Sequence, residues 1–417
     1  MFRTLSLTFI AFASLATLLL GQEKSTTWNQ WRGPNRDGHF QGAVWPTSLD
    51  ESALKLAWQK ELPESYSGPV VSSKLVFTTG TENKKNEIVA AFDRTTGEEK
   101  WRVSWPGSLS VPFFAASNGS WIRATPAFDG ETLYVAGIRD VLVALDGETG
   151  KEKWRVDFVE KLKATAPAFG FVSSPLVDGD AIYVQAGGSL VKLKKASGEI
   201  VWQSLKDGGG MNGSAFSSPI FATLAGRRQL LVQTRENLCG VDPDKGDVLW
   251  EQKVPSFRGM NILTPIPFGD AIFTSSYQNK SWLYGAAMNG DKFEIKETWN
   301  NNAQAYMSTP VVVGDYAYVQ LQNQRYTCIN LKTGERTWTS KAYGKYASLI
   351  ANGDLILALD QRGELLLFKA NPKEFEVLSE RKVSDQETWA HLAVDGDELF
   401  IRELKGLSVF KWGSPAK

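Results

Sequence analysis

The sequence reads D-R-T-T-G-E-E-K-W at residues 93–101 and D-G-E-T-G-K-E-K-W at residues 146–154. Aligning further copies on a glycine four residues before a tryptophan adds the pairs Gly198 and Trp202, Gly246 and Trp250, and Gly334 and Trp338. These tryptophans are 53, 48, 48 and 88 residues apart, and a degenerate copy ending at Trp299 divides the last interval. A motif that returns at nearly constant spacing indicates a repeat architecture.

A Ser or Thr followed by Pro marks the same period, and weaker copies bring the number of units to eight. The pairs stand at residues 125–126, 174–175, 218–219, 264–265 and 309–310, with weaker copies at 67–69, 348–349 and 391–392. The mean spacing is roughly 46 residues, which is typical of a four-stranded blade of a β-propeller. We therefore predict an all-β, eight-bladed β-propeller over residues 53–417. A seven-bladed ring, without the degenerate unit at 346–383, is the alternative.

One unit, residues 123–156, shows where the strands of a blade are expected. Asp129-Gly130 is a tight-turn signal, and the alternating run at 132–136 follows it, then strands at 141–145 and 153–156. The repeated nonapeptide is thus the last hairpin of a blade, in which Asp caps the turn and Gly accepts a positive φ. The large apolar tryptophan is expected to pack one sheet against its neighbour. The predicted blade-docking residues are Trp58, Trp101, Trp154, Trp202, Trp250 and Trp338.

The two ends of the chain are predicted to meet in one blade. The last unit, beginning near residue 388, supplies only three strands, whereas residues 53–62 form an isolated strand that carries Trp58. Pairing this strand with the segment near 405–412 would complete the eighth sheet and remove an exposed edge.

The composition excludes one class of partner, and the first residues of the chain indicate where the protein is located. Lys+Arg and Asp+Glu both number 46, which argues against a nucleic-acid partner, because binding to phosphates requires a basic surface. Residues 1–21 resemble a signal peptide, with an uncleaved membrane anchor as the alternative. We therefore expect an exported, periplasmic or cell-envelope monomer, without a lipid anchor because no cysteine follows the apolar stretch. Cys239 and Cys328 fall on blades four and six and are expected to stay unpaired.

The strong copies, such as A-L-D-G-E-T-G-K-E-K-W from Ala144 to Trp154, resemble the pyrroloquinoline quinone (PQQ) repeat family. The resemblance implies either a quinoprotein dehydrogenase, with PQQ and Ca²⁺ on the propeller axis, or a cofactor-free binding scaffold similar to the outer-membrane assembly factor BamB. The sequence lacks adjacent cysteines and a convergent set of acidic residues, because most Asp residues belong to Asp-Gly turns. We favour a non-catalytic scaffold without cofactor, and a PQQ/Ca²⁺-dependent dehydrogenase is the alternative.

Two segments are candidates for binding a protein or peptide partner. The leader, residues 22–52, contains W-N-Q-W-R-G-P-N-R-D-G at 28–38, which resembles the N-terminus of exported bacterial PQQ-like propellers. It is expected to pack on the ring as a strap, with a second recognition element as the alternative. The long loops entering each blade combine aromatic residues with arginine, as binding surfaces do, although they could simply pack over the channel. The candidate partner-binding residues are Trp121, Arg123, Phe171, Phe216, Arg258, Tyr306 and Trp389.

Overall fold

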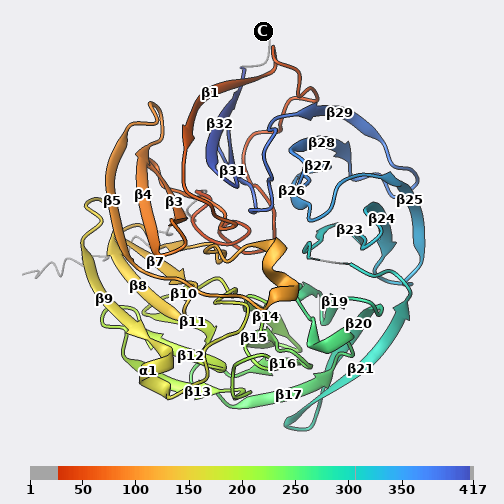
Figure 1. Ribbon diagram of the computed structural model, residues 1–417. Coiled ribbons are helices and arrows are strands. Elements are labelled where there is room, and N and C mark those ends of the chain that lie inside the picture. Colours follow the sequence, from red (N-terminus) through yellow and green to blue (C-terminus); the bar gives the residue numbers. More distant parts are fainter. Residues whose placement is uncertain (1–26, 306, 414–417) are drawn as a thin grey trace, which may run out of the picture.

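The computed structural model describes residues 27–305 and 307–413, so the predicted signal peptide at residues 1–21 lies outside the described residues. Eight four-stranded antiparallel sheets form a ring (Figure 1). The predicted eight-bladed β-propeller is confirmed. The seven-bladed alternative is wrong, because residues 348–382 form a complete sheet of their own.

In each of the first four blades the strands follow one another from the channel to the rim. Blade 1 contains β2 (Val70–Val71), β3 (Leu75–Glu82), β4 (Asn86–Asp93) and β5 (Glu99–Pro106). Blade 2 contains β6 (Ala127–Phe128), β7 (Thr132–Gly137), β8 (Val141–Asp146) and β9 (Glu152–Asp157). Blade 3 contains β10 (Leu176–Asp178), β11 (Ala181–Ala186), β12 (Ser189–Lys194) and β13 (Ile200–Ser204). Blade 4 contains β14 (Ile220–Leu224), β15 (Arg227–Gln233), β16 (Asn237–Val241) and β17 (Val248–Lys253).

The other four blades repeat this order, except that the outer strand of blade 8 comes from the start of the chain. Blade 5 contains β18 (Ile266–Phe268), β19 (Ala271–Ser275), β20 (Ser281–Asn289) and β21 (Lys292–Asn301). Blade 6 contains β22 (Val311–Val313), β23 (Tyr316–Gln320), β24 (Arg325–Asn330) and β25 (Arg336–Ala342). Blade 7 contains β26 (Ser348–Asn352), β27 (Leu355–Leu359), β28 (Glu364–Lys369) and β29 (Val377–Lys382). Blade 8 contains β30 (Ala393–Asp395), β31 (Glu398–Glu403), β32 (Gly406–Trp412) and β1 (Leu54–Glu61).

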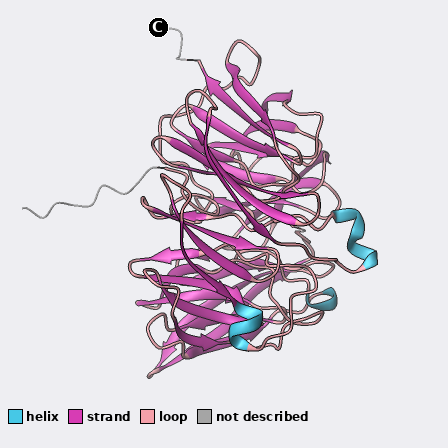
Figure 2. Ribbon diagram, turned by 60° about the vertical axis from the view of Figure 1, so that its left-hand side comes forward, coloured by secondary structure: helices cyan, strands magenta, loops and turns pink. Residues whose placement is uncertain are grey.

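Three short helices of the described residues lie in the loops between blades. They are η1 (Phe113–Asn118), α1 (Phe158–Leu162) and η2 (Phe257–Gly259). Helix η1, orange near the centre of Figure 1, projects from one face of the ring when the molecule is turned (Figure 2). No helix among the described residues is long and apolar enough to cross a membrane.

Blade 8 closes the ring as predicted. Strand β1 pairs antiparallel with β32, with Leu54 opposite Trp412 and Leu56 opposite Phe410. A bulge between Leu56 and Trp58 shifts the register, so that Trp58 lies opposite Val409. Pairing the first strand of the ring with the last leaves no open edge between the chain ends.

The repeated glycine and tryptophan belong to the contact between consecutive blades. The ring of Trp101 in blade 1 covers Gly150 in the turn of blade 2, where a Cβ would lie 2.6 Å from the indole. The indole N–H of Trp101 donates to the carbonyl of Gly147 in the same turn, at 3.0 Å. Only glycine combines the positive φ of this turn, +73° at Gly150, with room for the ring. The other tryptophan and glycine pairs of this kind are Trp58 and Gly97, Trp154 and Gly198, Trp202 and Gly246, and Trp299 and Gly334.

Two predicted docking tryptophans depart from this pairing. Trp250 packs with blade-5 residues, but its indole donates to Gln229 of its own blade at 2.6 Å, and a Cβ on Gly290 in the blade-5 turn would meet nothing within 4 Å. The long β20–β21 hairpin places that turn beyond the reach of Trp250. Trp338 donates to the carbonyl of Asn371 in a turn that lacks the glycine.

The Ser or Thr of the second marker joins neighbouring blades near the axis. The Thr125 amide donates to the Ser174 hydroxyl at 3.0 Å, and the Ser174 amide donates to the Ser218 hydroxyl at 2.9 Å. The Gly68 amide donates to Thr125 and the Thr264 amide to Thr309 in the same way. Each hydroxyl therefore satisfies an amide just before the inner strand of the preceding blade, which explains why the marker recurs.

The described part of the leader, residues 27–52, lies in the channel and then between two blades. Buried Arg32 donates to the carbonyls of Thr309 and Pro310, and buried Arg36 donates to those of Ser174 and Pro175. Farther along, Trp45 and Leu49 pack between blades 7 and 8 in one apolar cluster with β27, β28, β31 and β32. The leader thus contacts residues far apart in the chain.

The two cysteines are buried and unpaired on β16 and β24, the third strands of blades 4 and 6. The expectation that they do not form a disulfide is confirmed. Burial raises the pKa of both thiols, so they are unreactive core residues.

Candidate functional site

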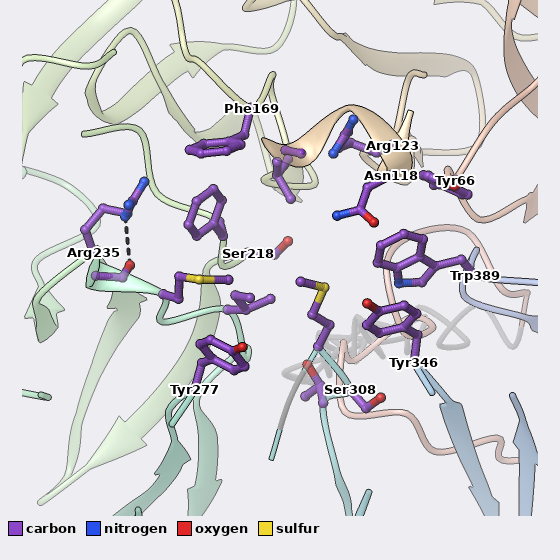
Figure 3. Close-up of a pocket in the computed structure, with 18 of the residues that line it drawn as sticks. Tyr66, Asn118, Arg123, Phe169, Ser218, Arg235, Tyr277, Ser308, Tyr346 and Trp389 are labelled. Carbon is purple, nitrogen blue, oxygen red and sulfur yellow. Dashed lines mark hydrogen bonds between the residues drawn. The ribbon is translucent and has the colours of Figure 1, made fainter. Parts of the chain in front are cut away.

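The loops on the face that carries η1 enclose a pocket of about 1110 Å³ (Figure 3). Its lining includes the hydroxyl or imidazole residues of the second marker, from Ser174 and Ser218 to Ser348 and His391. Trp31 of the leader also lines the pocket, and its indole donates to Thr264 at 3.1 Å. Eight further aromatic residues of the described chain line it, namely Tyr66, Phe114, Phe169, Phe216, Phe257, Tyr277, Tyr346 and Trp389.

Four of the seven predicted binding residues lie together in this pocket. Arg123, Phe216, Arg258 and Trp389 all line it. They come from the loops that enter blades 2, 4, 5 and 8, so the ring brings together residues that are up to 266 positions apart.

The other three predicted residues are not part of the described lining. Phe171 is 2% exposed and packs edge-to-face on Phe158 in the core of blades 2 and 3. The turn in which the Gly170 amide donates to the Pro167 carbonyl leaves Phe169 in the pocket and Phe171 in the core. Trp121 is half-buried outside the lining, with the Lys84 ammonium 5.9 Å from its ring. Tyr306 lies outside the described residues.

The binding residues predicted from the sequence did not include any methionine. Met211, Met260 and Met307 line the pocket, and the whole chain contains only five methionines. All three stand in loops that enter consecutive blades, so their concentration is visible in the sequence. Methionine is flexible and polarisable, which suits a surface that adapts to an apolar ligand.

The two ends of the pocket have the same composition of arginine and aromatic rings. Arg123, Tyr66, Tyr346 and Trp389 lie at one end, and Arg235, Phe169 and Tyr277 lie at the other (Figure 3). Arg235 donates to the carbonyls of Gly213, Arg258 and Gly259, and its guanidinium lies 4.3 Å from the ring centroid of Phe216. These contacts fix the Arg235 side chain in place.

A three-ring stack forms the wall near Arg123. Trp389 stacks on Tyr346 with ring centroids 4.0 Å apart and an interplanar angle of 11°. Tyr66 contacts the same indole at 4.6 Å and donates its hydroxyl to Glu387 at 3.2 Å. Burial raises the pKa of Tyr66 to about 12, and the Glu387 carboxylate adds to the shift. The phenol is therefore a neutral hydrogen-bond donor at neutral pH.

The rim of the pocket exposes apolar side chains. Phe113 is 91% exposed, and Phe114, Met211 and Phe257 are between 44% and 55% exposed. Their concentration around one opening is unusual for a soluble surface and typical of an interaction site. Helix η1, which carries Phe113 and Phe114, stands out from the ring at this point (Figure 2).

The lining does not provide the ligands that a calcium-bound quinone requires. Ca²⁺ takes six to eight oxygen ligands with several carboxylates among them. The lining contains one carboxylate, that of Glu236, which is exposed. No group of three or more His, Cys, Asp or Glu residues suited to a metal ion occurs within 27–305 and 307–413. The residues that line the pocket therefore do not fit a calcium-bound quinone.

Comparison with known proteins agrees with the repeats and the ring. The family model described as outer membrane protein assembly factor BamB matches residues 84–340, more than half of the chain. The chain belongs to the BamB family. BamB of Moranella endobia (strain PCIT) is 22% identical over 346 residues, covering 81% of this chain and 83% of that protein.

BamB-like propellers are also similar to enzymes. Polyvinylalcohol dehydrogenase of Sphingopyxis sp. (strain 113P3) is 29% identical over 191 residues, covering 42% of this chain and 28% of that protein. Among solved structures, BamB from Moraxella catarrhalis has a TM-score of 0.63 at 15% identity, covering 86% of this chain and 100% of that one. Quinohemoprotein alcohol dehydrogenase from Comamonas testosteroni has a TM-score of 0.68 at 14% identity, covering 94% and 82%. These structural likenesses show the fold alone.

Proposed function

We propose that this BamB-family protein is a non-catalytic scaffold of the cell envelope that binds a protein or peptide partner through the loop-face pocket. The observation that carries the proposal is the pocket itself, which combines aromatic walls, three methionines and an exposed apolar rim. Aromatic residues, Met and Arg are enriched at the centres of protein interfaces, and Glu and Asp are depleted there.

The geometry suits an inserted segment of a partner better than a flat contact. A pocket of about 1110 Å³ exceeds what a small ligand requires and has room for several side chains of an extended peptide. The blade sheets anchor the loops that form its walls, and anchoring of this kind lowers the cost of ordering on binding. Phe113 and Phe114 would then contact the partner at the rim.

Relatives support the location and the kind of partner. The relatives are named outer membrane protein assembly factor, which denotes a role in the assembly of outer membrane proteins. We propose a similar setting for this chain, with the protein exported, monomeric by itself and free of a bound cofactor. Light scattering of the purified protein should give the mass of one chain.

The scaffold role is tested at the exposed rim, where substitutions should leave the fold intact. Phe113, Phe114 and Phe257 changed together to Ser should abolish capture of envelope proteins that the wild type retains. Val201 and Val248, which are exposed on the outer strands β13 and β17, provide a matched control when changed to Ser. Equal capture by the rim variant and the wild type, with both proteins folded, would refute the proposed surface.

The enzymatic alternative has a direct assay. We expect no dye reduction with alcohol or sugar donors when the purified protein is supplied with PQQ and Ca²⁺. The reason is that the pocket has a single carboxylate and lacks a calcium site. Turnover that depends on both the quinone and the pocket would make the dehydrogenase the better assignment.

A further inference from the structure

Arg123 is a half-buried cation that lines the pocket, and backbone carbonyls hold its guanidinium. Its Nε donates to the Trp121 carbonyl at 3.2 Å, and one terminal nitrogen donates to the Gly119 carbonyl at 3.0 Å. Burial lowers its pKa to about 10, and the nearby Tyr66 phenol opposes the shift. The group therefore remains charged at neutral pH although it is partly buried.

No carboxylate of the described chain forms an ion pair with Arg123. The carboxylate of Glu387 accepts a hydrogen bond from the Tyr66 hydroxyl. The whole lining carries Arg123, Arg235 and Arg258 against Glu236, whereas the complete sequence is neutral. Burial lowers the pKa of His391 to about 3, so this residue contributes no charge. The pocket is thus locally cationic: none of its three arginines forms an ion pair within the described residues, although Asp207 favours the charged form of Arg235.

The surroundings of Arg123 indicate which kind of ligand it can bind. A partly buried charge without a counterion has lost part of its solvation, and an anion that enters the pocket would offset that cost. A guanidinium binds a carboxylate through short charge-assisted hydrogen bonds. The three-ring stack of Tyr66, Tyr346 and Trp389 adjoins it, and this stack offers an apolar face to a ring next to the carboxylate.

We infer that Arg123 and the adjacent aromatic stack form a subsite for a carboxylate that neighbours an aromatic or large apolar group. The inference rests on the proposed scaffold function and names the segment that the pocket takes: a stretch of the partner chain with an acidic group beside an aromatic side chain. Asn118, which precedes the Gly119 carbonyl held by Arg123, supplies a neutral amide at the same end of the pocket (Figure 3). The acidic group is an Asp or Glu side chain or a C-terminal carboxylate.

Small probes test this subsite without knowledge of the partner. N-acetylphenylalanine and its uncharged amide differ only at the carboxylate, and a ligand-observed NMR titration at pH 7 measures both. We expect the acid to bind at least tenfold more tightly than the amide. The dipeptide N-acetyl-Phe-Glu-amide carries its carboxylate on a side chain, and its affinity relative to the acid shows which source fits better. Equal binding of acid and amide, or no binding of any probe, would overturn the inference.

Two variants assign the preference to Arg123. Arg123→Gln should remove the difference between acid and amide, whereas Arg336→Gln on the exposed outer strand β25 should leave it unchanged. Asn118→Asp keeps both backbone contacts of Arg123 and places a carboxylate at the same end of the pocket, so it should remove the preference too. This second variant keeps the test valid if Arg123→Gln does not fold. An acid preference that persists in Asn118→Asp and in a folded Arg123→Gln protein would place the anion elsewhere.

The outcomes separate the subsite from the scaffold role. If the rim variant loses its partner but acid and amide bind alike, the scaffold stands and the subsite falls. If the acid preference depends on Arg123 but rim substitutions leave capture unchanged, the subsite stands and the scaffold assignment falls.

Discussion

Two of the contacts between neighbouring blades differ in where the packing side chain comes from. At the junction of blades 1 and 2, Trp101 of one repeat covers Gly150 of the next. At the junction of blades 7 and 8, the position of the tryptophan on β29 is taken by Ser379, which stands opposite Leu367. The Ser379 hydroxyl accepts the amide of Leu49, and Trp45 and Leu49 of the leader fill the space. A blade that lacks its own docking residue is thus completed by a distant segment.

The comparison teaches that the repeat and the leader are two solutions to one packing problem. A sheet face left bare between blades exposes apolar surface, at a cost of roughly 25 cal/mol per Å². Trp45 stacks between Phe40 and Trp412, with centroids 5.9 and 5.6 Å away, and is as deeply buried as any docking tryptophan. Leader residues therefore fill the same kind of space between blades as the repeat tryptophans, but they do not carry the repeat motif.

The largest effect is expected at the leader-filled junction. Trp45→Ala should lower the free energy of unfolding by about 4–5 kcal/mol, because it removes a fully buried indole from a tight aromatic stack. Val44→Ala is the control, since Val44 is 73% exposed and its loss should change little. Urea denaturation measures both variants. A Trp45 variant as stable as the Val44 variant would show that the leader does not support the ring.

A repeat tryptophan should have a smaller effect where it is only half-buried. Trp154→Ala should cost about 3 kcal/mol, since the indole keeps partial contact with solvent while covering Gly198 and donating to the Lys195 carbonyl. The same denaturation measurement compares it with Trp45→Ala. If Trp154→Ala lowers the free energy of unfolding more than Trp45→Ala does, the ranking of the two junctions is reversed.

Substitutions of glycine separate the stability cost of lost packing from the cost of a strained backbone conformation. Gly198→Ala should cost about 2–3 kcal/mol, because the residue has φ +71° and its Cβ would lie 2.7 Å from Trp154. Gly179→Ala, with φ +54° and nothing within 4 Å, should cost only the conformational part, about 1 kcal/mol. In a double-mutant cycle, Trp154→Ala should remove much of the extra cost of Gly198→Ala. Full additivity would argue against the contact.

The smallest effect concerns a polar contact at the same junction of blades 2 and 3, and it depends on pH. The Asp140 carboxylate accepts the Gly187 amide at 2.7 Å, and burial raises the pKa of Asp140 to about 7. Because the folded protein binds a proton that the unfolded chain has already lost, stability falls as pH rises from about 4 to 7. Asp140→Asn keeps the acceptor and removes the ionisation. It should therefore raise the melting temperature at pH 8 and leave it nearly unchanged near pH 4.

Asp129 provides the opposite sign as a control. Burial would raise the pKa of its carboxyl, but the amides of Thr132 and Glu131 hold it below the usual value. Asp129→Asn should therefore destabilise the protein at pH 8 and have less effect as pH falls through the Asp129 pKa. If both variants shift the melting temperature in the same direction at pH 8, the assignment of the two carboxyls is wrong.

The site could be predicted from the sequence only in part. Arg123, Phe216, Arg258 and Trp389 line the pocket because loops that enter the blades converge on one face of any propeller. Phe171 does not, because a turn of four residues decides which of two neighbouring phenylalanines points into the pocket. No pattern in the loop distinguishes Phe169 from Phe171. Their different environments depend on which neighbouring loop leaves room for a ring.

The sequence by itself determined the all-β class, the eight blades and the closure of blade 8, because each blade must repeat the residues that cover its neighbour. Tertiary structure alone decided where the leader lies, since Arg32 and Arg36 find carbonyls of blades 6 and 3 that are far away in the chain. It also decided that Arg123 meets the rings of Tyr66 and Trp389 in one pocket. Contacts between neighbouring repeats recur in each blade, so they produce a motif that repeats along the sequence. Contacts across the ring occur once each, so they leave no repeating trace.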